Sequence, residues 1–259
     1  MPPTGSMRVL HSPRMSIPPV DLVYLRDQFR ELAARVREAR DAAGFTPGEI
    51  DTPALLRDAM AQLVDMLGDH RDSDADSGLS AGELNTLTEY GLHLLDELAQ
   101  LARDVGQASL AAEVECLSLP LALWVARSGG EIRRLAPVVN ALAQFANESK
   151  SPQDMAALYA CCCELVEAVS PLAYDETLAE EALKPWRLLL LNRAIVATRS
   201  HNPELMQQAF DAIVEQLPNE ARRFFAEGME QMAVVDYPKH VQELMRRYFL
   251  AYAAPRHLH

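Results

Sequence analysis

The chain has 259 residues, of which 49% are hydrophobic and 24% are charged. These values are ordinary for a folded protein and argue against global disorder. The formal net charge is −13 at pH 7. This charge argues against nucleic acid or an anionic membrane as the main partner, because each would need a basic protein surface. With 11 glycines and 16 prolines, the chain also has too few turn residues for an all-β protein.

The N-terminal segment, residues 1–18, is predicted to be a disordered leader. It is rich in proline and contains no apolar stretch typical of a secretory signal. We expect order to begin near Pro19 and residues 19–259 to form a single all-helical domain. No uninterrupted apolar stretch reaches the roughly 18 residues that a membrane span needs. The sequence therefore predicts no membrane partner.

Helical periodicity dominates the rest of the chain. Capping side chains directly before proline mark helix starts at Thr52, Ser151 and Asn202, and Ser80 with Glu83 has the spacing of a capping box. The sequence predicts about ten helices, at residues 19–43, 52–68, 80–104, 107–127, 131–148, 152–169, 175–199, 203–216, 219–234 and 238–253. Short connections favour antiparallel helical hairpins, in a compact or solenoid-like bundle. The exception is an acidic loop at residues 69–79.

Two segments, residues 114–127 and 185–199, are apolar on nearly every side and are predicted to be central helices. Pro120 and Pro185 are expected to kink these helices or to begin new segments. Trp124 lies in the first of them and is expected to be buried, because that segment offers no polar face.

The sequence contains no recognisable catalytic motif. P-loop, dinucleotide-binding, nucleophile-elbow and zinc-protease patterns are all missing, although catalytic groups assembled from distant positions remain open. The four cysteines, Cys116 and Cys161–Cys163, lack C-x-x-C spacing and are predicted to be buried structural thiols. We therefore expect no catalytic residue, metal or cofactor, and a reduced, cytoplasmic protein. Whether it is an enzyme stays open, with a non-enzymatic role favoured.

One acidic segment resembles a calcium-binding loop. Residues Asp72–Glu83 place carboxylates at loop positions 1, 3, 5 and 12, as an EF-hand does. The turn glycine falls one residue late, at Gly78, and Glu83 is also explained by its capping box with Ser80. A solvated acidic loop is the favoured interpretation, and calcium binding is the weaker alternative.

Arg193 is predicted to lie inside the second central helix. An enclosed arginine must be paired, because its charge cannot be removed. We expect a bidentate bond to a carboxylate of another helix. In the alternative, Arg193 and Asn192 are the polar groups of a pocket that binds an anion or another small molecule.

The last third of the chain is rich in methionine and aromatic residues at helical spacing. Core packing is the favoured explanation. In the alternative, Phe225, Met229, Met232 and Met245 form an adaptable groove for a partner helix or peptide.

Helical hairpins, an acidic surface and the missing catalytic motifs favour a cytoplasmic interaction module or adaptor. Its expected partner is another protein, bound through a helix or an extended, basic peptide. Residues 51–104 contain 12 acids and 3 bases, so they should attract such a peptide. The alternatives are a small-molecule pocket or enzyme site near Arg193, and calcium binding. A homo-oligomer remains open.

Overall fold

The protein is described by a computed structural model, which defines residues 17–44, 52–72, 79–173 and 179–253. The α-helices are α1 (Leu22–Ala42), α2 (Thr52–Asp72), α3 (Ala81–Asp104), α4 (Ala108–Cys116), α5 (Ser118–Arg127), α6 (Leu135–Glu148), α7 (Pro152–Ala168), α8 (Glu180–Arg199), α9 (Pro203–Gln216), α10 (Pro218–Val234) and α11 (Lys239–Tyr248). A 3₁₀ turn, η1 (Pro171–Ala173), and a π-helical turn, η2 (Phe249–Ala253), complete them. These ranges contain no strand beyond one isolated bridge between Ile132 and Val169, so the all-α prediction is confirmed.

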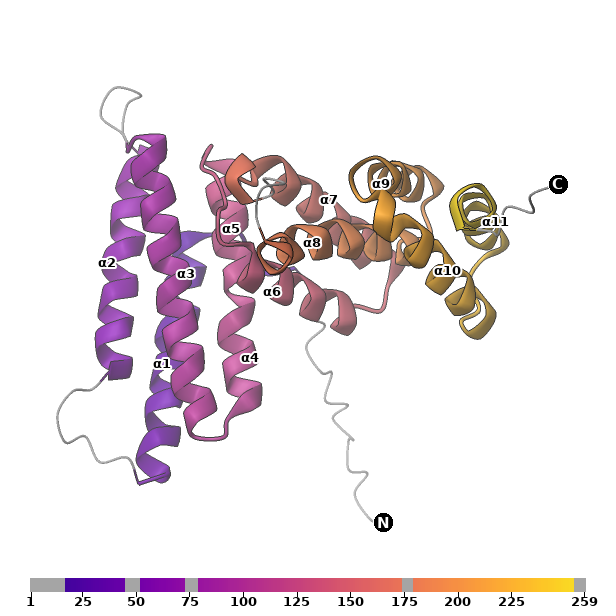
Figure 1. Cartoon of the computed structure of the whole chain (residues 1–259). Coiled ribbons are helices and arrows are strands. Elements are labelled where there is room, and N and C mark those ends of the chain that lie inside the picture. Colours follow the sequence, from indigo (N-terminus) through magenta and orange to yellow (C-terminus); the bar gives the residue numbers. More distant parts are fainter. Residues whose placement is uncertain (1–16, 45–51, 73–78, 174–178, 254–259) are drawn as a thin grey trace, which may run out of the picture.

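The helices stack in two rows. In one row α3 packs on α5 and α5 on α7, and in the other α4 packs on α6 and α6 on α8. Figure 1 shows α1, α2, α3 and α4 side by side at one end of the molecule, with α9, α10 and α11 at the other. The buried apolar side chains form one cluster that extends from Leu22 to Ala253. The division of the chain into a leader and one domain stays a prediction.

Capping side chains place several helix starts where the sequence indicates them. The Oγ of Ser80 accepts a hydrogen bond from the backbone N–H of Glu83, and the Glu83 carboxylate accepts one in return from the Ser80 N–H. Ser151 and Asn202 cap α7 and α9. Asp21 caps α1, so this helix begins at Leu22 rather than at residue 19.

Three predicted boundaries change for clear physical reasons. Pro18, expected in the leader, is buried, because the apolar residues beside it pack against the core. The segment 107–127 is two helices, α4 and α5, since the Pro120 ring disrupts the preceding turn. Residues 131–134 precede α6 because Ile132 pairs its backbone with residues 168 and 170.

The two predicted central helices differ in their surroundings. α5 is buried along almost its whole length, and Trp124 is only 5% exposed, as predicted. α8 continues through Pro185 without a break and is not enclosed, because Leu188 and Ile195 are exposed on one side. Among the described residues, one helical stretch, Ala108–Arg127, is long and apolar enough to cross a membrane. Since 72% of it is buried inside the protein, it is typical of a core helix.

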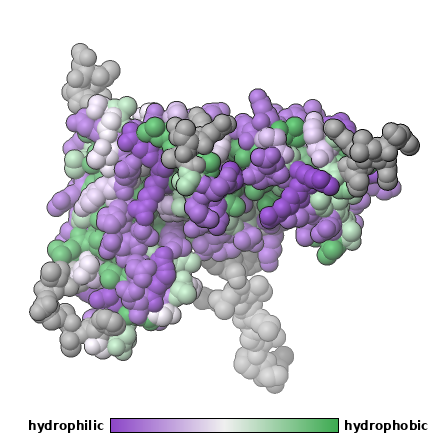
Figure 2. Space-filling view, viewed as in Figure 1, coloured by the Kyte–Doolittle hydropathy of each residue, from purple (hydrophilic) through white to green (hydrophobic). Residues whose placement is uncertain are grey.

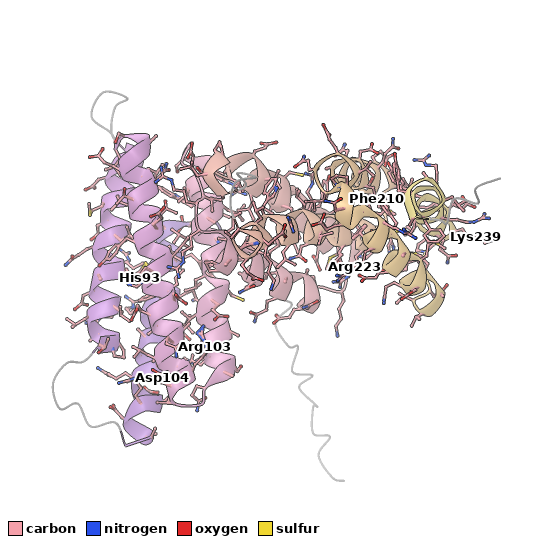
Figure 3. The ribbon with its side chains drawn as sticks, in the orientation of Figure 1. His93, Arg103, Asp104, Phe210, Arg223 and Lys239 are labelled. Atoms are coloured by element: carbon pink, nitrogen blue, oxygen red, sulfur yellow. The ribbon has the colours of Figure 1, made fainter. Side chains whose placement is uncertain are left out.

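Figures 2 and 3 show how polar and apolar side chains divide between surface and interior. In Figure 2 the visible face is largely hydrophilic, with small apolar patches between polar side chains. In Figure 3 Phe210 lies between the terminal helices, and Arg223 and Lys239 lie on their surface. Phe210 makes edge-to-face contacts with Phe224, Phe225 and Tyr248. This aromatic cluster holds α9, α10 and α11 together.

Candidate functional site

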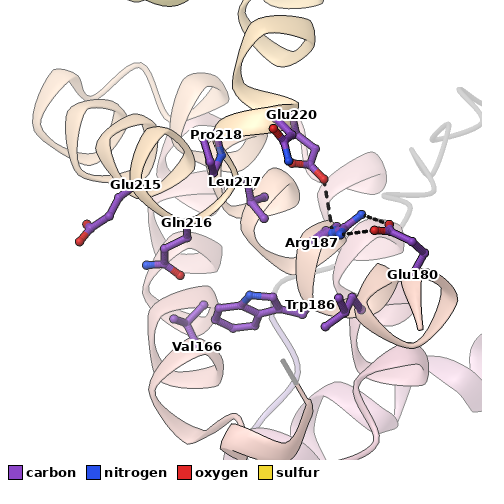
Figure 4. A pocket seen from close by; sticks show the side chains of 11 residues that line it. Val166, Glu180, Trp186, Arg187, Glu215, Gln216, Leu217, Pro218 and Glu220 are labelled. Atoms are coloured by element: carbon purple, nitrogen blue, oxygen red, sulfur yellow. Dashed lines mark hydrogen bonds and ion pairs between the residues drawn. The ribbon is translucent and has the colours of Figure 1, made fainter. Parts of the chain in front are cut away.

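A cavity of about 870 Å³ opens between α7 and α9, where the C-terminal ends of both helices lie beside the beginning of α8. We call it the α7–α9 groove. Its lining residues are Val166, Glu180, Leu183, Trp186, Arg187, Glu215, Gln216, Leu217, Pro218, Asn219 and Glu220. Figure 4 shows the Trp186 indole across the base of the groove, between Val166 and Arg187. A half-buried aromatic ring of this kind is a typical contact surface for a bound chain.

One side of the groove is fixed by ion pairs. Arg187 donates two hydrogen bonds to the Glu180 carboxylate, and its Nε lies 3.3 Å from Oε1 of Glu220. The bond from Arg187 lowers the pKa of the Glu180 carboxyl. This cluster joins α8 to the first turn of α10 along one side of the groove.

A second cavity, of about 540 Å³, lies beside the groove, between the ends of α5 and α7. Glu131, Glu164 and Glu167 line it together with one base, Arg127. Arg127 forms a bidentate pair with Glu164 at 2.6 and 3.1 Å. The C-terminal ends of α5, α7 and α9 therefore line the two cavities, with α7 between them.

The region around the two cavities carries uncompensated negative charge. The last turns of α7 and α9 contain no basic residue, and they hold Glu167 and Glu215. Helix C-termini are themselves the negative ends of the helix dipoles, so carboxylates there are unfavourable. Within the described residues, the side chains of Glu131, Glu167 and Glu215 form no ion pair. Cations from a partner would relieve this repulsion.

The acids of the N-terminal helices are better compensated. Asp65 lies 3.5 Å from Arg26, and Asp96 lies 2.7 Å from Arg134. The negative balance of residues 51–104 is thus partly neutralised by other segments.

Arg193 does not have the partner that the sequence suggests. Its Nη2 donates a 3.3 Å hydrogen bond to the Tyr159 hydroxyl, and its guanidinium carbon lies 5.4 Å from the centre of the Tyr159 ring. The hydroxyl in turn donates a 3.4 Å bond to Oε1 of Gln208. No carboxylate of the described residues pairs with Arg193, and its Nε is buried without any hydrogen-bond partner. The predicted bidentate ion pair is wrong, because a tyrosine occupies the place of the acid.

The side chains of Arg193, Tyr159 and Gln208, which we call the Arg193 cluster, do not enclose Asn192. Successive helical residues point about 100° apart, and Asn192 makes no hydrogen bond to the cluster. Asn192 and Arg193 are both partly exposed, and neither lines the α7–α9 groove. A pocket with Asn192 and Arg193 as its polar groups stays a prediction.

The methionine and aromatic residues of the last third are mainly core. Phe225 is fully buried and Met245 is 2% exposed, with the sulfur of Met245 packed over Gly228. Met229 and Met232 are partly buried and pack against the same cluster. The burial of these side chains agrees with the core interpretation, and a partner groove at Phe225, Met229, Met232 and Met245 stays a prediction.

The cysteines and the acidic loop are the remaining groups that the sequence singled out. Cys161 and Cys162 are buried, and burial raises the pKa of the Cys161 thiol to about 11. The centre of the suggested calcium loop, residues 73–78, lies outside the described residues. Glu83 is engaged in its capping box, and α2 continues to Asp72, past its predicted end. No group of three or more metal-ligating side chains occurs among the described residues.

The groove itself was not predicted, although part of its signal is present in the sequence. Glu167 and Glu215 occupy last-turn positions where a helix favours basic residues. That Trp186 lies beside them depends on how α7, α8 and α9 pack. Comparison of the chain with known protein families, curated proteins and solved structures found no match.

Proposed function

We propose that the protein is a cytoplasmic interaction module that binds a basic, extended segment of another protein in the α7–α9 groove. The observation that carries this proposal is the α7–α9 groove itself, a cavity with a half-buried tryptophan at its base and one unpaired glutamate, Glu215, in its lining, while a second, Glu167, lines the neighbouring cavity. Aromatic surface gives contact area, and the surplus carboxylates select for positive charge.

Charge supports a basic partner in two ways. Lysine and arginine side chains can pair with Glu215 and Glu167, which have no ion-pair partner among the described residues. Their positive charge also interacts favourably with the C-terminal ends of α7 and α9. Such contacts accelerate association and weaken as salt increases, because they lie near solvent.

The proposal is tested with a peptide of alternating lysine and alanine, titrated into the protein while tryptophan emission is recorded. Binding at the groove should change the emission of Trp186 and not that of buried Trp124. The signal should therefore disappear in Trp186→Phe. A peptide of alternating glutamate and alanine is the charge control.

Replacing Glu215 with glutamine should weaken the binding of the lysine peptide, because Glu215 is the unpaired acid in the lining of the groove. Glu230→Gln is the matched control, because Glu230 is exposed on α10 and does not line the groove. Equal binding of lysine and glutamate peptides, or equal losses in the groove and control variants, would contradict the proposal.

The second candidate is a small-molecule anion site at Arg193, supported by the missing acid and by the unpartnered Nε. Tyr159 already covers one face of the guanidinium, and the larger cavity lies elsewhere on α8. We therefore rank this candidate below the interaction module.

A further inference from the structure

A cavity of about 480 Å³, which we call the α1–α6 cleft, lies between α1, α4 and α6. Apolar side chains from all three helices line it, among them Tyr24 and Leu32 of α1, Cys116 of α4 and Phe145 of α6. Along α1 the lining extends from Tyr24 to Arg35, a span of about 16 Å at 1.5 Å per residue. An extended chain advances about 3.3 Å per residue, so the cleft has the length of about five residues of such a chain.

The acids of this cleft outnumber its bases. Glu31, Glu113 and Glu148 line it together with one arginine, Arg35. The Arg35 guanidinium is already engaged, because it donates hydrogen bonds of 2.5 and 2.9 Å to the two oxygens of the Glu113 carboxylate. Among the described residues, Glu31 and Glu148 form no ion pair. The α1–α6 cleft therefore favours a ligand that carries positive charge beside apolar side chains.

The chain itself leads into this cleft. Pro18, which is buried, and Pro19 both belong to its lining. Residues 1–16 precede them closely and lie outside the described residues. In sequence this segment contains two bases, Arg8 and Arg14, and no acid. Its apolar residues include Met7, Val9, Leu10 and Met15. The segment thus has the combination of charge and apolar side chains that the cleft favours.

The connection between the segment and the cleft is short. Arg14 precedes Pro18 by four residues, so an extended chain reaches about 13 Å from that proline. This reach is comparable with the length of the cleft, in which Glu31 and Glu148 both lie. Because the segment is tethered, its binding is intramolecular, and a short tether gives an effective concentration on the order of millimolar. Contacts that would be weak between separate molecules are then sufficient.

We propose that residues 1–16 dock in the α1–α6 cleft of their own chain, with Arg14 beside Glu31 and Glu148 and the apolar side chains against Tyr24 and Phe145. Two observations identify this occupant. The lining of the cleft begins at Pro18, close to the end of the segment, and the charges of the two are complementary. Docking replaces the free leader that the composition predicts. It neutralises a second acidic cleft, so the α7–α9 groove stays the site for a separate basic chain.

Trypsin cleavage after Arg14 tests the docking in the intact protein, because the protease must bind this arginine side chain itself. Mass spectrometry follows the release of fragment 1–14 during brief digestion, and a synthetic peptide of residues 1–20 gives the rate for a free chain. If opening and closing are faster than cleavage, the rate is proportional to the open fraction. We expect the protein to be cleaved roughly 10-fold more slowly than the peptide, and this protection to decrease as salt increases.

The double variant Glu31→Gln and Glu148→Gln should be cleaved several-fold faster than wild type. The matched control replaces Glu38 and Glu230 with glutamine, because both are exposed, neither lines the cleft, and the net charge changes equally. The control should be cleaved at the wild-type rate. Ala112→Phe fills the cleft from α4 without changing charge, and it should also release the segment. Thermal melting checks that each variant is folded.

Three results would overturn the proposal. Cleavage of wild-type protein at the rate of the peptide would mean that the segment is free and that the cleft serves another partner. Slow cleavage that is unchanged in the cleft variants would assign the protection to the folded chain near Arg14 rather than to docking. Protection that increases with protein concentration would place the segment on a second copy of the protein.

Discussion

Replacing Arg193 with methionine should leave the stability of the protein almost unchanged. Methionine fills much of the space of the arginine stem and removes the guanidinium. In the structure this group makes one long hydrogen bond and one contact with the face of the Tyr159 ring. Tyr159 keeps its bond to Gln208 after the change, so its hydroxyl is not left without a partner.

The opposing contributions are similar in size. Loss of the contact with the tyrosine ring costs about 0.5–1 kcal/mol, and loss of the long hydrogen bond costs about 1 kcal/mol. Removal of Nε, which is buried without a partner, recovers about 1–3 kcal/mol of desolvation. The free energy of unfolding should therefore change by no more than about 1 kcal/mol. A buried arginine–carboxylate pair would instead cost about 3–5 kcal/mol on truncation.

Urea unfolding monitored by circular dichroism measures this difference, provided that the slope of the transition is unchanged. Tyr159→Phe is the control, and it should be the more destabilising of the two. It removes the only hydrogen-bond partner of the Arg193 guanidinium within the described residues and leaves the buried Nε in place. A loss of 3 kcal/mol or more in Arg193→Met would refute this reasoning and indicate that an acid pairs with Arg193.

Three further predictions test the rest of the structure. Glu215→Gln, in the last turn of α9, should raise the free energy of unfolding by about 0.3–1 kcal/mol. Glu204→Gln, in the first turn, should lower it, because the helix dipole acts with opposite sign at the two ends. Changes of the same sign for both variants in urea unfolding would contradict the charge argument. Gly91→Ala should destabilise the protein by about 1–3 kcal/mol, since the added Cβ would lie 2.8 Å from Leu63 and 2.9 Å from Leu121. Gly68→Ala, with nothing within 4 Å, should stabilise α2 by about 0.5–1 kcal/mol. In native protein Cys163 should be alkylated before the other cysteines, because it is the most exposed of them. Cys116 should react slowly, because burial raises the pKa of its thiol to about 12 and the thiolate is the reactive form. Mass spectrometry of the labelled peptides gives the order.

Local signals in the sequence determined the helical class and most helix positions. Ser80, Ser151 and Asn202 satisfy the first backbone N–H groups of their helices within a few residues, so their effect needs no distant partner. The same holds for Pro120, whose ring disrupts the turn directly before it. The burial of Trp124 followed from an apolar segment that has no polar side.

The tertiary structure decided which faces are covered and which groups meet. Leu188 and Ile195 read as core residues, yet they are exposed because neighbouring helices cover only part of α8. Arg193 was expected to need an acid, but Tyr159, 34 residues away on α7, occupies that place. The α7–α9 groove likewise forms from three helices whose ends are brought together only by packing. Helix formation depends on contacts within a few residues, whereas partner choice and cavities depend on side chains that are distant in the sequence.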